Sequence, residues 1–151
     1  MTEENSLRKR LDEEIKAAMK AQNKTRLSAL RSIKSAVRNK EIDLHKELSD
    51  VEIQDVVATL VKQRKDSIEQ FSRGGRGDLV AQETGELNVL LEFLPQQLTE
   101  AEVEAIVDKA LAELGTSSIK DLGKVMKHVM SQVAGRADGK MVNEIVRRKL
   151  S

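Results

Sequence analysis

Apolar residues recur at steps of three and four along most of the chain, which is the spacing of one buried face of an α-helix. The pattern predicts seven helices, over residues 5–22, 25–40, 49–72, 78–94, 99–114, from 118 to the turn at 135–138, and 138–150. No segment alternates between apolar and polar positions with the period of two that a half-buried β-strand shows. The chain is therefore predicted to be all-α.

Capping signals support two of these helix starts and one helix end. Ser49 with Glu52, and Thr99 with Glu102, have the spacing of a capping box, in which each side chain bonds an unpaired backbone N–H of the first turn. Gly115 follows the fifth predicted helix, where a left-handed residue commonly ends a helix. These local signals agree with the boundaries that the apolar pattern gives.

Pro95 marks the boundary between two predicted domains. A proline disfavours helical backbone in the residue before it, so Pro95 is predicted to end the fourth helix. We expect a helical N-terminal domain of antiparallel helices over residues 1–95 and a small three-helix tail domain over residues 96–151. In the tail domain, Ser118 and Asp121 are predicted to open the sixth helix of the chain.

Two glycines lie inside predicted helices, where glycine costs about 1 kcal/mol relative to alanine. The simplest reason for such a glycine is close packing. We therefore expect a neighbour against Gly85 and another helix crossing directly over Gly123. Gly74, Gly75 and Gly77 follow no predicted strand and precede no Gly-Lys-Ser/Thr, so they are predicted to form a helix–helix turn instead of a phosphate loop.

The composition removes several classes of chemistry. The 151 residues include no cysteine, hence no disulfide, thiolate nucleophile or sulfur-ligated metal. The two histidines, His45 and His128, belong to no cluster with metal-ligand spacing, and no nucleophile elbow, Walker A loop or dinucleotide fingerprint is present. We predict no catalytic residues, no metal, no small-molecule cofactor and no intrinsic hydrolase or transferase activity.

No apolar run approaches the ~18 residues that span a bilayer, and residues 1–11 lack the apolar region of a signal peptide. Apolar residues make up 39% of the chain and charged residues 34%, which is typical of a folded helical protein. The protein is predicted to be cytoplasmic and not bound to a membrane.

Charge is distributed unevenly, although the formal net charge is only +1. Residues 1–40 carry eleven Lys and Arg against five Asp and Glu, residues 41–116 seven against seventeen, and residues 117–151 eight against three. The basic ends fit contact with a polyanion, or alternatively ion pairing with the acidic middle. The same alternatives, phosphate contact or a solvated and internally paired face, apply to four cations on one arc of the second predicted helix: Lys24, Arg31, Lys34 and Arg38.

The turn before the last predicted helix is the most distinctive segment. Gly135 is predicted to take left-handed backbone and Asp138 to cap the last helix, which holds Arg136 on a short rigid turn. Backbone N–H groups at the start of the last helix add to the attraction for an anion. Three lysines are expected to reach the same side as Arg136: Lys124, Lys127 and Lys140. The alternative is a compact three-helix domain whose turn happens to be basic.

Short motifs in this order resemble those of a known family. The tail carries Leu122-Gly123-Lys124-Val125-Met126, then Gly135-Arg136-Ala137-Asp138-Gly139-Lys140 and Asn143. Upstream stand Arg26-Leu27-Ser28, Lys62-Gln63-Arg64, Gly75-Arg76 with Asp78-Leu79, and Phe93-Leu94-Pro95. Together they resemble the YqeY family over nearly the whole chain. The tail also resembles, more loosely, the C-terminal tail of GatB, a component of the aspartyl/glutamyl-tRNA amidotransferase.

The resemblance implies a helical N-terminal domain followed by a three-helix tail domain. It implies kinship with the part of GatB that handles tRNA, and not with the part that activates the carboxylate or binds metal. It also implies that four residues form the structural motif of the tail: Gly123, Gly135, Asp138 and Asn143.

Our hypothesis is a non-catalytic module that binds tRNA, or a tRNA–protein assembly, through a basic tail. The residues expected to contact the nucleic acid are Lys124, Lys127, Arg136 and Lys140. One alternative is an accessory component of a glutamine-dependent carbon–nitrogen ligase, the tRNA-dependent amidotransferase. Another is a protein-interaction adaptor. The sequence leaves the oligomeric state open.

Overall fold

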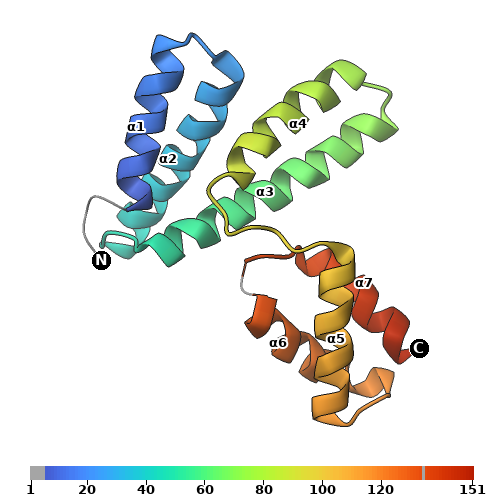
Figure 1. The fold of residues 1–151 in the computed structure, drawn as a ribbon. Coiled ribbons are helices and arrows are strands. Elements are labelled where there is room, and N and C mark those ends of the chain that lie inside the picture. Colours follow the sequence, from blue (N-terminus) through green and yellow to red (C-terminus); the bar gives the residue numbers. More distant parts are fainter. Residues whose placement is uncertain (1–5, 134) are drawn as a thin grey trace. The chain divides into compact units, whose positions relative to one another are not determined.

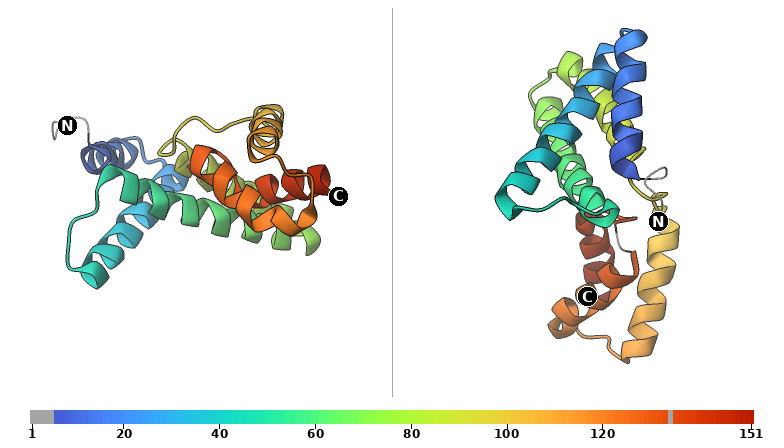
Figure 2. Two further views of the ribbon diagram at one scale, coloured as in Figure 1. Left: turned by 90° about the horizontal axis from the view of Figure 1, so that it is seen from below. Right: turned by 90° about the vertical axis from the view of Figure 1, so that its left-hand side faces the viewer.

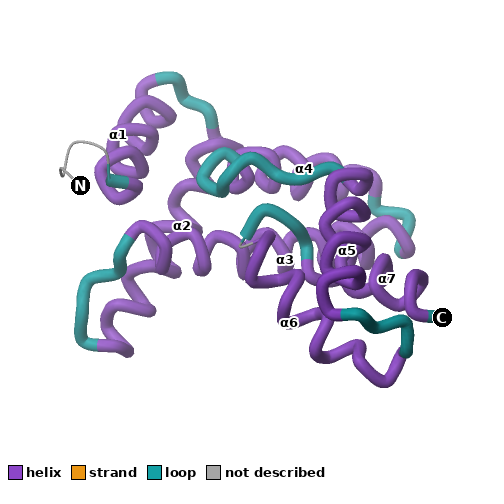
Figure 3. The backbone as a smooth tube through the Cα atoms, turned by 60° about the horizontal axis from the view of Figure 1, so that its bottom comes forward, coloured by secondary structure: helices purple, strands orange, loops and turns teal. Residues whose placement is uncertain are grey.

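The computed structural model describes residues 6–133 and 135–151, so residue 5, where the first helix is predicted to begin, lies outside them. The described residues form seven α-helices, a short 3₁₀ helix (Ile119–Asp121) and no strand, which confirms the prediction of an all-α protein (Figures 1 and 3). The α-helices are α1 (Leu7–Lys20), α2 (Lys24–Leu44), α3 (Asp50–Arg73), α4 (Gly77–Leu91), α5 (Glu100–Leu114), α6 (Leu122–Val133) and α7 (Gly139–Leu150).

The chain divides into two compact units, Met1–Leu94 and Pro95–Ser151, each with a hydrophobic core of its own. The first unit consists of two helical hairpins, α1 with α2 and α3 with α4, and α2 also packs against α4 (Figures 1 and 2). Burying each large aliphatic side chain of such a core contributes about 1.5–3 kcal/mol. Its largest fully buried side chains include Leu30, Ile33, Ile53, Val57 and Leu90.

Gly85 allows α2 and α4 to approach closely. A Cβ atom added at Gly85 would lie 3.2 Å from Cγ2 of Thr25, which is tighter than an ordinary van der Waals contact. The prediction of a neighbour packed against this glycine is confirmed.

A buried ion cluster joins α3 to α4. The guanidinium of Arg64 lies 2.6 Å from the carboxylate of Glu83 and 3.1 Å from that of Glu86, and Glu86 is only 3% exposed. A buried carboxylate needs such a partner because the protein interior solvates charge poorly. The nearby Arg76 pairs with Asp78 in its own turn.

Both predicted capping boxes are present. The Ser49 hydroxyl accepts from the Glu52 backbone N–H while the Glu52 carboxylate accepts from that of Ser49, and Thr99 and Glu102 exchange the same pair of bonds. Gly115 ends α5 with a φ of 63°, the left-handed conformation expected for it.

Helix α4 ends at Leu91 and not at Pro95, which corrects the predicted helix end. The N–H groups of residues 92–94 bond to carbonyls three residues back, so a tighter turn follows the helix. This turn carries Phe93 into the core, where the ring is 2% exposed and lies 4.6 Å below the guanidinium of Arg10. Pro95 comes only after this turn, so it is not the residue at which the helix stops.

The start of α6 also differs from the prediction. Ser118 caps the short 3₁₀ helix by accepting from the backbone N–H of Lys120. The carboxylate of Asp121 does not return to Ser118 but accepts from the hydroxyl of Thr116. Aspartate is one methylene shorter than the glutamate of a capping box, so its reach differs, and the α-helix begins only at Leu122, after the 3₁₀ helix.

The second unit is a three-helix domain in which α5, α6 and α7 pack on one another. Valine dominates its core, at positions spaced by four residues on each helix. The completely buried valines are Val103, Val107, Val125, Val129, Val133, Val142 and Val146.

Candidate nucleic-acid interface

The turn between α6 and α7 has the backbone that its glycine and aspartate predict. Gly135 has a φ of 78°, in the left-handed region, and the Arg136 N–H donates to the carbonyl of Val133 at 2.8 Å. The Asp138 carboxylate accepts from the backbone N–H of Lys140 at 3.0 Å and caps α7. The predictions for Gly135 and Asp138 are confirmed.

Residues 95–98 hold this turn in place, an arrangement that the sequence did not predict. The Leu98 N–H donates to the Arg136 carbonyl at 2.7 Å, and the Gln97 side-chain amide donates to the Gly135 carbonyl at 3.0 Å. The Nε of Arg136 donates to the carbonyl of Gln96 at 3.2 Å. Arg136 is thus held by a backbone oxygen, which fixes its position without neutralising its charge.

Lys124 and Lys127 share one exposed face of α6. Val125, Val129 and Val133 fill the opposite, buried face, and the helical period of 3.6 residues turns both lysines away from it. Neither lysine forms an ion pair with another residue in the described part of the chain. Their charge therefore faces solvent.

Gly123 has a different environment from the one predicted. It is the second residue of α6, it is exposed, and a Cβ atom added there would meet nothing within 4 Å. No helix of the described residues crosses over it, so that expectation is wrong. The packing of this unit gives no reason for a glycine at this position.

The remaining predicted residues lie on α7. Lys140 is exposed in the first turn of α7, close in sequence to Arg136 and Asp138. That Lys124 and Lys127 reach the same side as Arg136 stays a prediction. Asn143 accepts from the Nε of Arg147 through its side-chain oxygen at 2.8 Å.

The last cations of α7 are neutralised by acidic residues of α5. Arg148 bonds to Glu104 at 3.0 Å, and Lys149 lies 3.2 Å from both Glu104 and Asp108. Hydrogen bonds to Asp108 and Glu104 raise the pKa of Lys149. Arg148 and Lys149 are thus paired with carboxylates of α5, in contrast to the two lysines of α6.

The described residues contain no group of three or more His, Cys, Asp or Glu side chains placed to hold a metal ion. His128 is partly exposed on α6, and its Nε2 lies 3.3 Å from the Glu113 carboxylate and 3.1 Å from the Gln132 amide. No helix within the described ranges is long and apolar enough to cross a bilayer.

The family model of YqeY-like proteins matches residues 8–150, nearly the whole chain. The chain belongs to the YqeY family. The resemblance seen in its motifs is therefore confirmed, and the two units described above are those of a YqeY-like protein.

Curated relatives carry the name "Altered inheritance of mitochondria protein 41, mitochondrial". The protein from Lachancea thermotolerans is 34% identical over 146 residues, which cover 92% of this chain and 78% of the relative. One from Saccharomyces cerevisiae is 32% identical over 128 residues, or 84% of this chain and 68% of the relative. One from Kluyveromyces lactis is 39% identical over 111 residues, which cover 71% of this chain and 60% of the relative.

Proposed function

We propose that this YqeY-family protein is a non-catalytic module that binds tRNA, alone or in a tRNA–protein assembly, through its tail unit. The contacting residues in this proposal are Lys124, Lys127, Arg136 and Lys140. The observation that supports it most directly is that some cations of the tail are paired with carboxylates and others are not. Arg148 and Lys149 are paired with carboxylates of α5, whereas the two lysines of α6 have no ion-pair partner in residues 6–133 and 135–151.

The turn between α6 and α7, which residues 95–98 hold in place, supports the same proposal. Binding is tighter when a contacting side chain is already ordered, because less conformational entropy is lost on association. Arg136 meets this condition, since Gln96 fixes its Nε and Leu98 fixes its carbonyl.

The chemistry of the tail favours the phosphate backbone of a folded RNA over unpaired bases. The chain has no Trp or Tyr, and its two aromatic residues, Phe71 and Phe93, both belong to the first unit. Unpaired bases are usually recognised by stacking on aromatic side chains. Binding is therefore expected to depend on shape and phosphate contact, and to weaken steeply as salt rises.

The partner class rests on the likeness of the tail to that of GatB. A cytoplasmic location is part of this proposal, and the mitochondrion is the alternative because the relatives are named as mitochondrial proteins. Fractionating the source cells decides between the two compartments.

The test is binding of the full-length chain to a fluorescently labelled tRNA transcript, followed by anisotropy at low and at physiological salt. The variant Lys124→Glu with Lys127→Glu should raise the Kd at least about tenfold at low salt and leave the helical circular dichroism unchanged. The matched control, Lys62→Glu with Lys109→Glu, makes the same change of net charge at exposed lysines elsewhere. Equal loss in both double variants, or none in the α6 variant, overturns the proposal.

A further inference from the structure

A row of cations follows one exposed flank of α2 in the first unit. Lys24, Arg31, Lys34 and Arg38 are separated by seven, three and four residues, so they lie on one side of the helix over ~21 Å. Lys34 bonds to Asp12 at 2.9 Å. The other three side chains pair with no carboxylate of the part of the chain that is described. We propose that this α2 row is a second phosphate-binding surface, which contacts the backbone of a double-helical RNA.

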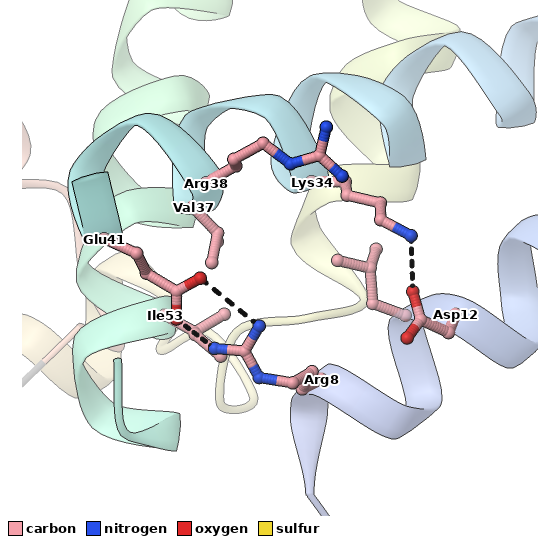
Figure 4. Close-up of a pocket in the computed structure, with 8 residues that line it drawn as sticks. Arg8, Asp12, Lys34, Val37, Arg38, Glu41 and Ile53 are labelled. Carbon is pink, nitrogen blue, oxygen red and sulfur yellow. Dashed lines mark hydrogen bonds and ion pairs between the residues drawn. The ribbon is translucent and has the colours of Figure 1, made fainter. Parts of the chain in front are cut away.

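The groove beside the row shows why a positive charge is left over. It lies between α1 and α2, and Figure 4 shows its charged side chains. Glu41 is bound by Arg8 and also accepts from the Leu48 N–H at 2.9 Å, while Asp12 is bound by Lys34. Both carboxylates are therefore occupied, and Arg38 has no interaction with either of them (Figure 4).

The carboxylate of Glu41 is kept ionised and in place by these bonds. Its pKa is lowered, chiefly by the hydrogen bond from Arg8 and then by that from Leu48. Glu41 therefore stays bound to Arg8 and Leu48 at physiological pH. It does not compete with an external phosphate for Arg38.

The size of the groove argues against a small-molecule ligand. Its volume is about 90 Å³, against roughly 300–1,000 Å³ for typical ligand pockets. A space of this size accepts phosphate oxygens at its rim but does not enclose a nucleotide.

The surface around the row favours RNA over an acidic protein. Every exposed residue of α2 from Lys24 to Lys40 is polar, including Ser28 and Ser35, and the exposed apolar residues of the helix, Ile42 and Leu44, follow only after the row. The centre of a protein–protein interface is normally apolar and often aromatic, whereas protein contacts to nucleic-acid backbone come from Arg, Lys and Ser side chains. A straight line of cations without aromatic neighbours suits the regular phosphates of a duplex better than unstacked bases.

The experiment measures the Kd of the full-length chain for a 20-base-pair RNA duplex (a probe of about two helical turns) as salt is varied. The variant Arg31→Glu with Arg38→Glu should weaken binding at least about tenfold at low salt and reduce the slope of log K against log salt by about two, one for each lost phosphate contact. Arg31→Gln with Arg38→Gln should give an intermediate loss. The Lys62→Glu, Lys109→Glu protein is again the charge-matched control.

The outcome is independent of the proposal for the tail. If the α2 variant loses binding to the duplex while the Lys124→Glu, Lys127→Glu variant does not, the α2 row is supported, and the tail proposal is decided separately by the tRNA measurement. If only the α6 variant loses binding, the α2 row is refuted. An unchanged affinity and salt slope in the α2 variant, with helicity retained, also refutes it, as does a loss no larger than that of the control.

Discussion

Replacing Gly123 by alanine separates the stability of the tail unit from its proposed RNA contact. Gly123 is not among the glycines with positive φ, and the added methyl group would meet nothing within 4 Å. Alanine loses less backbone entropy than glycine on entering a helix, so the free energy of unfolding should rise by about 0.5–1 kcal/mol. This gain corresponds to a rise in Tm of roughly 2–4 °C.

The same methyl group should weaken RNA binding. It would lie on the exposed side of α6, adjacent to Lys124 and one turn before Lys127. Where a nucleic-acid backbone packs against a helix, an added Cβ keeps its phosphates away from the neighbouring cations. We expect the Kd for tRNA to rise about threefold or more, or about 0.7 kcal/mol. Urea denaturation and fluorescence anisotropy on the same preparation give the two numbers.

Two other glycines provide controls. Gly77, the first residue of α4, also has open space around it, so Gly77→Ala should stabilise the protein without changing RNA affinity. Gly85→Ala should stabilise the protein less than Gly77→Ala does, because its Cβ would press on Cγ2 of Thr25. A Gly123→Ala protein that binds tRNA like the unchanged protein refutes close approach of RNA at this helix, and one that loses stability refutes our account of the site.

Three further predictions concern the fold. Gly135→Ala should lower the free energy of unfolding by about 1–2 kcal/mol, and Gly135→Asn by less, because asparagine tolerates left-handed backbone; urea denaturation measures both. Arg64→Met leaves the buried Glu86 carboxylate without its partner and should cost about 3 kcal/mol by the same assay. Hydrogen bonds from Lys46 and from the backbone N–H of Ser49 lower the pKa of Glu52 from 4.5 to about 2. The stabilisation that Glu52 provides is therefore present above pH 4.5 and is lost as the pH falls towards 2. Glu52→Gln should flatten the fall of urea midpoints in that range.

The helices of this protein were predictable because their signals are local. A capping box such as Ser49 with Glu52 satisfies its hydrogen bonds within four residues, so the sequence contains the whole arrangement. The same spacing at Ser118 and Asp121 gave a wrong helix start. Asp121 is shorter than glutamate, and its carboxylate accepts from the nearby Thr116 hydroxyl instead of from the Ser118 N–H.

The two helical glycines show where local reasoning stops. Gly85 and Gly123 have the same sequence signal, an isolated glycine within an apolar helical pattern, yet one contacts Thr25 and the other faces open space. Only the packing of distant segments distinguishes them. For the same reason the sequence placed Arg136 on a turn but not the carbonyl of Gln96 that holds it, which lies 40 residues away along the chain.

The near-neutral net charge of the chain is compatible with locally basic surfaces. Acidic side chains are used first to neutralise cations within the fold: Glu14 and Glu92 hold Arg26, and Glu104 holds Arg148. The cations left over include Lys24, Arg31 and Arg38 of α2 and Lys124 and Lys127 of α6, one group in each unit. In the two proposals above, each surface alone makes few phosphate contacts and therefore binds weakly. Both surfaces belong to one chain, so an RNA bound at one of them is at high effective concentration for the other. Where one RNA can reach both surfaces, the combined affinity exceeds that of either surface alone.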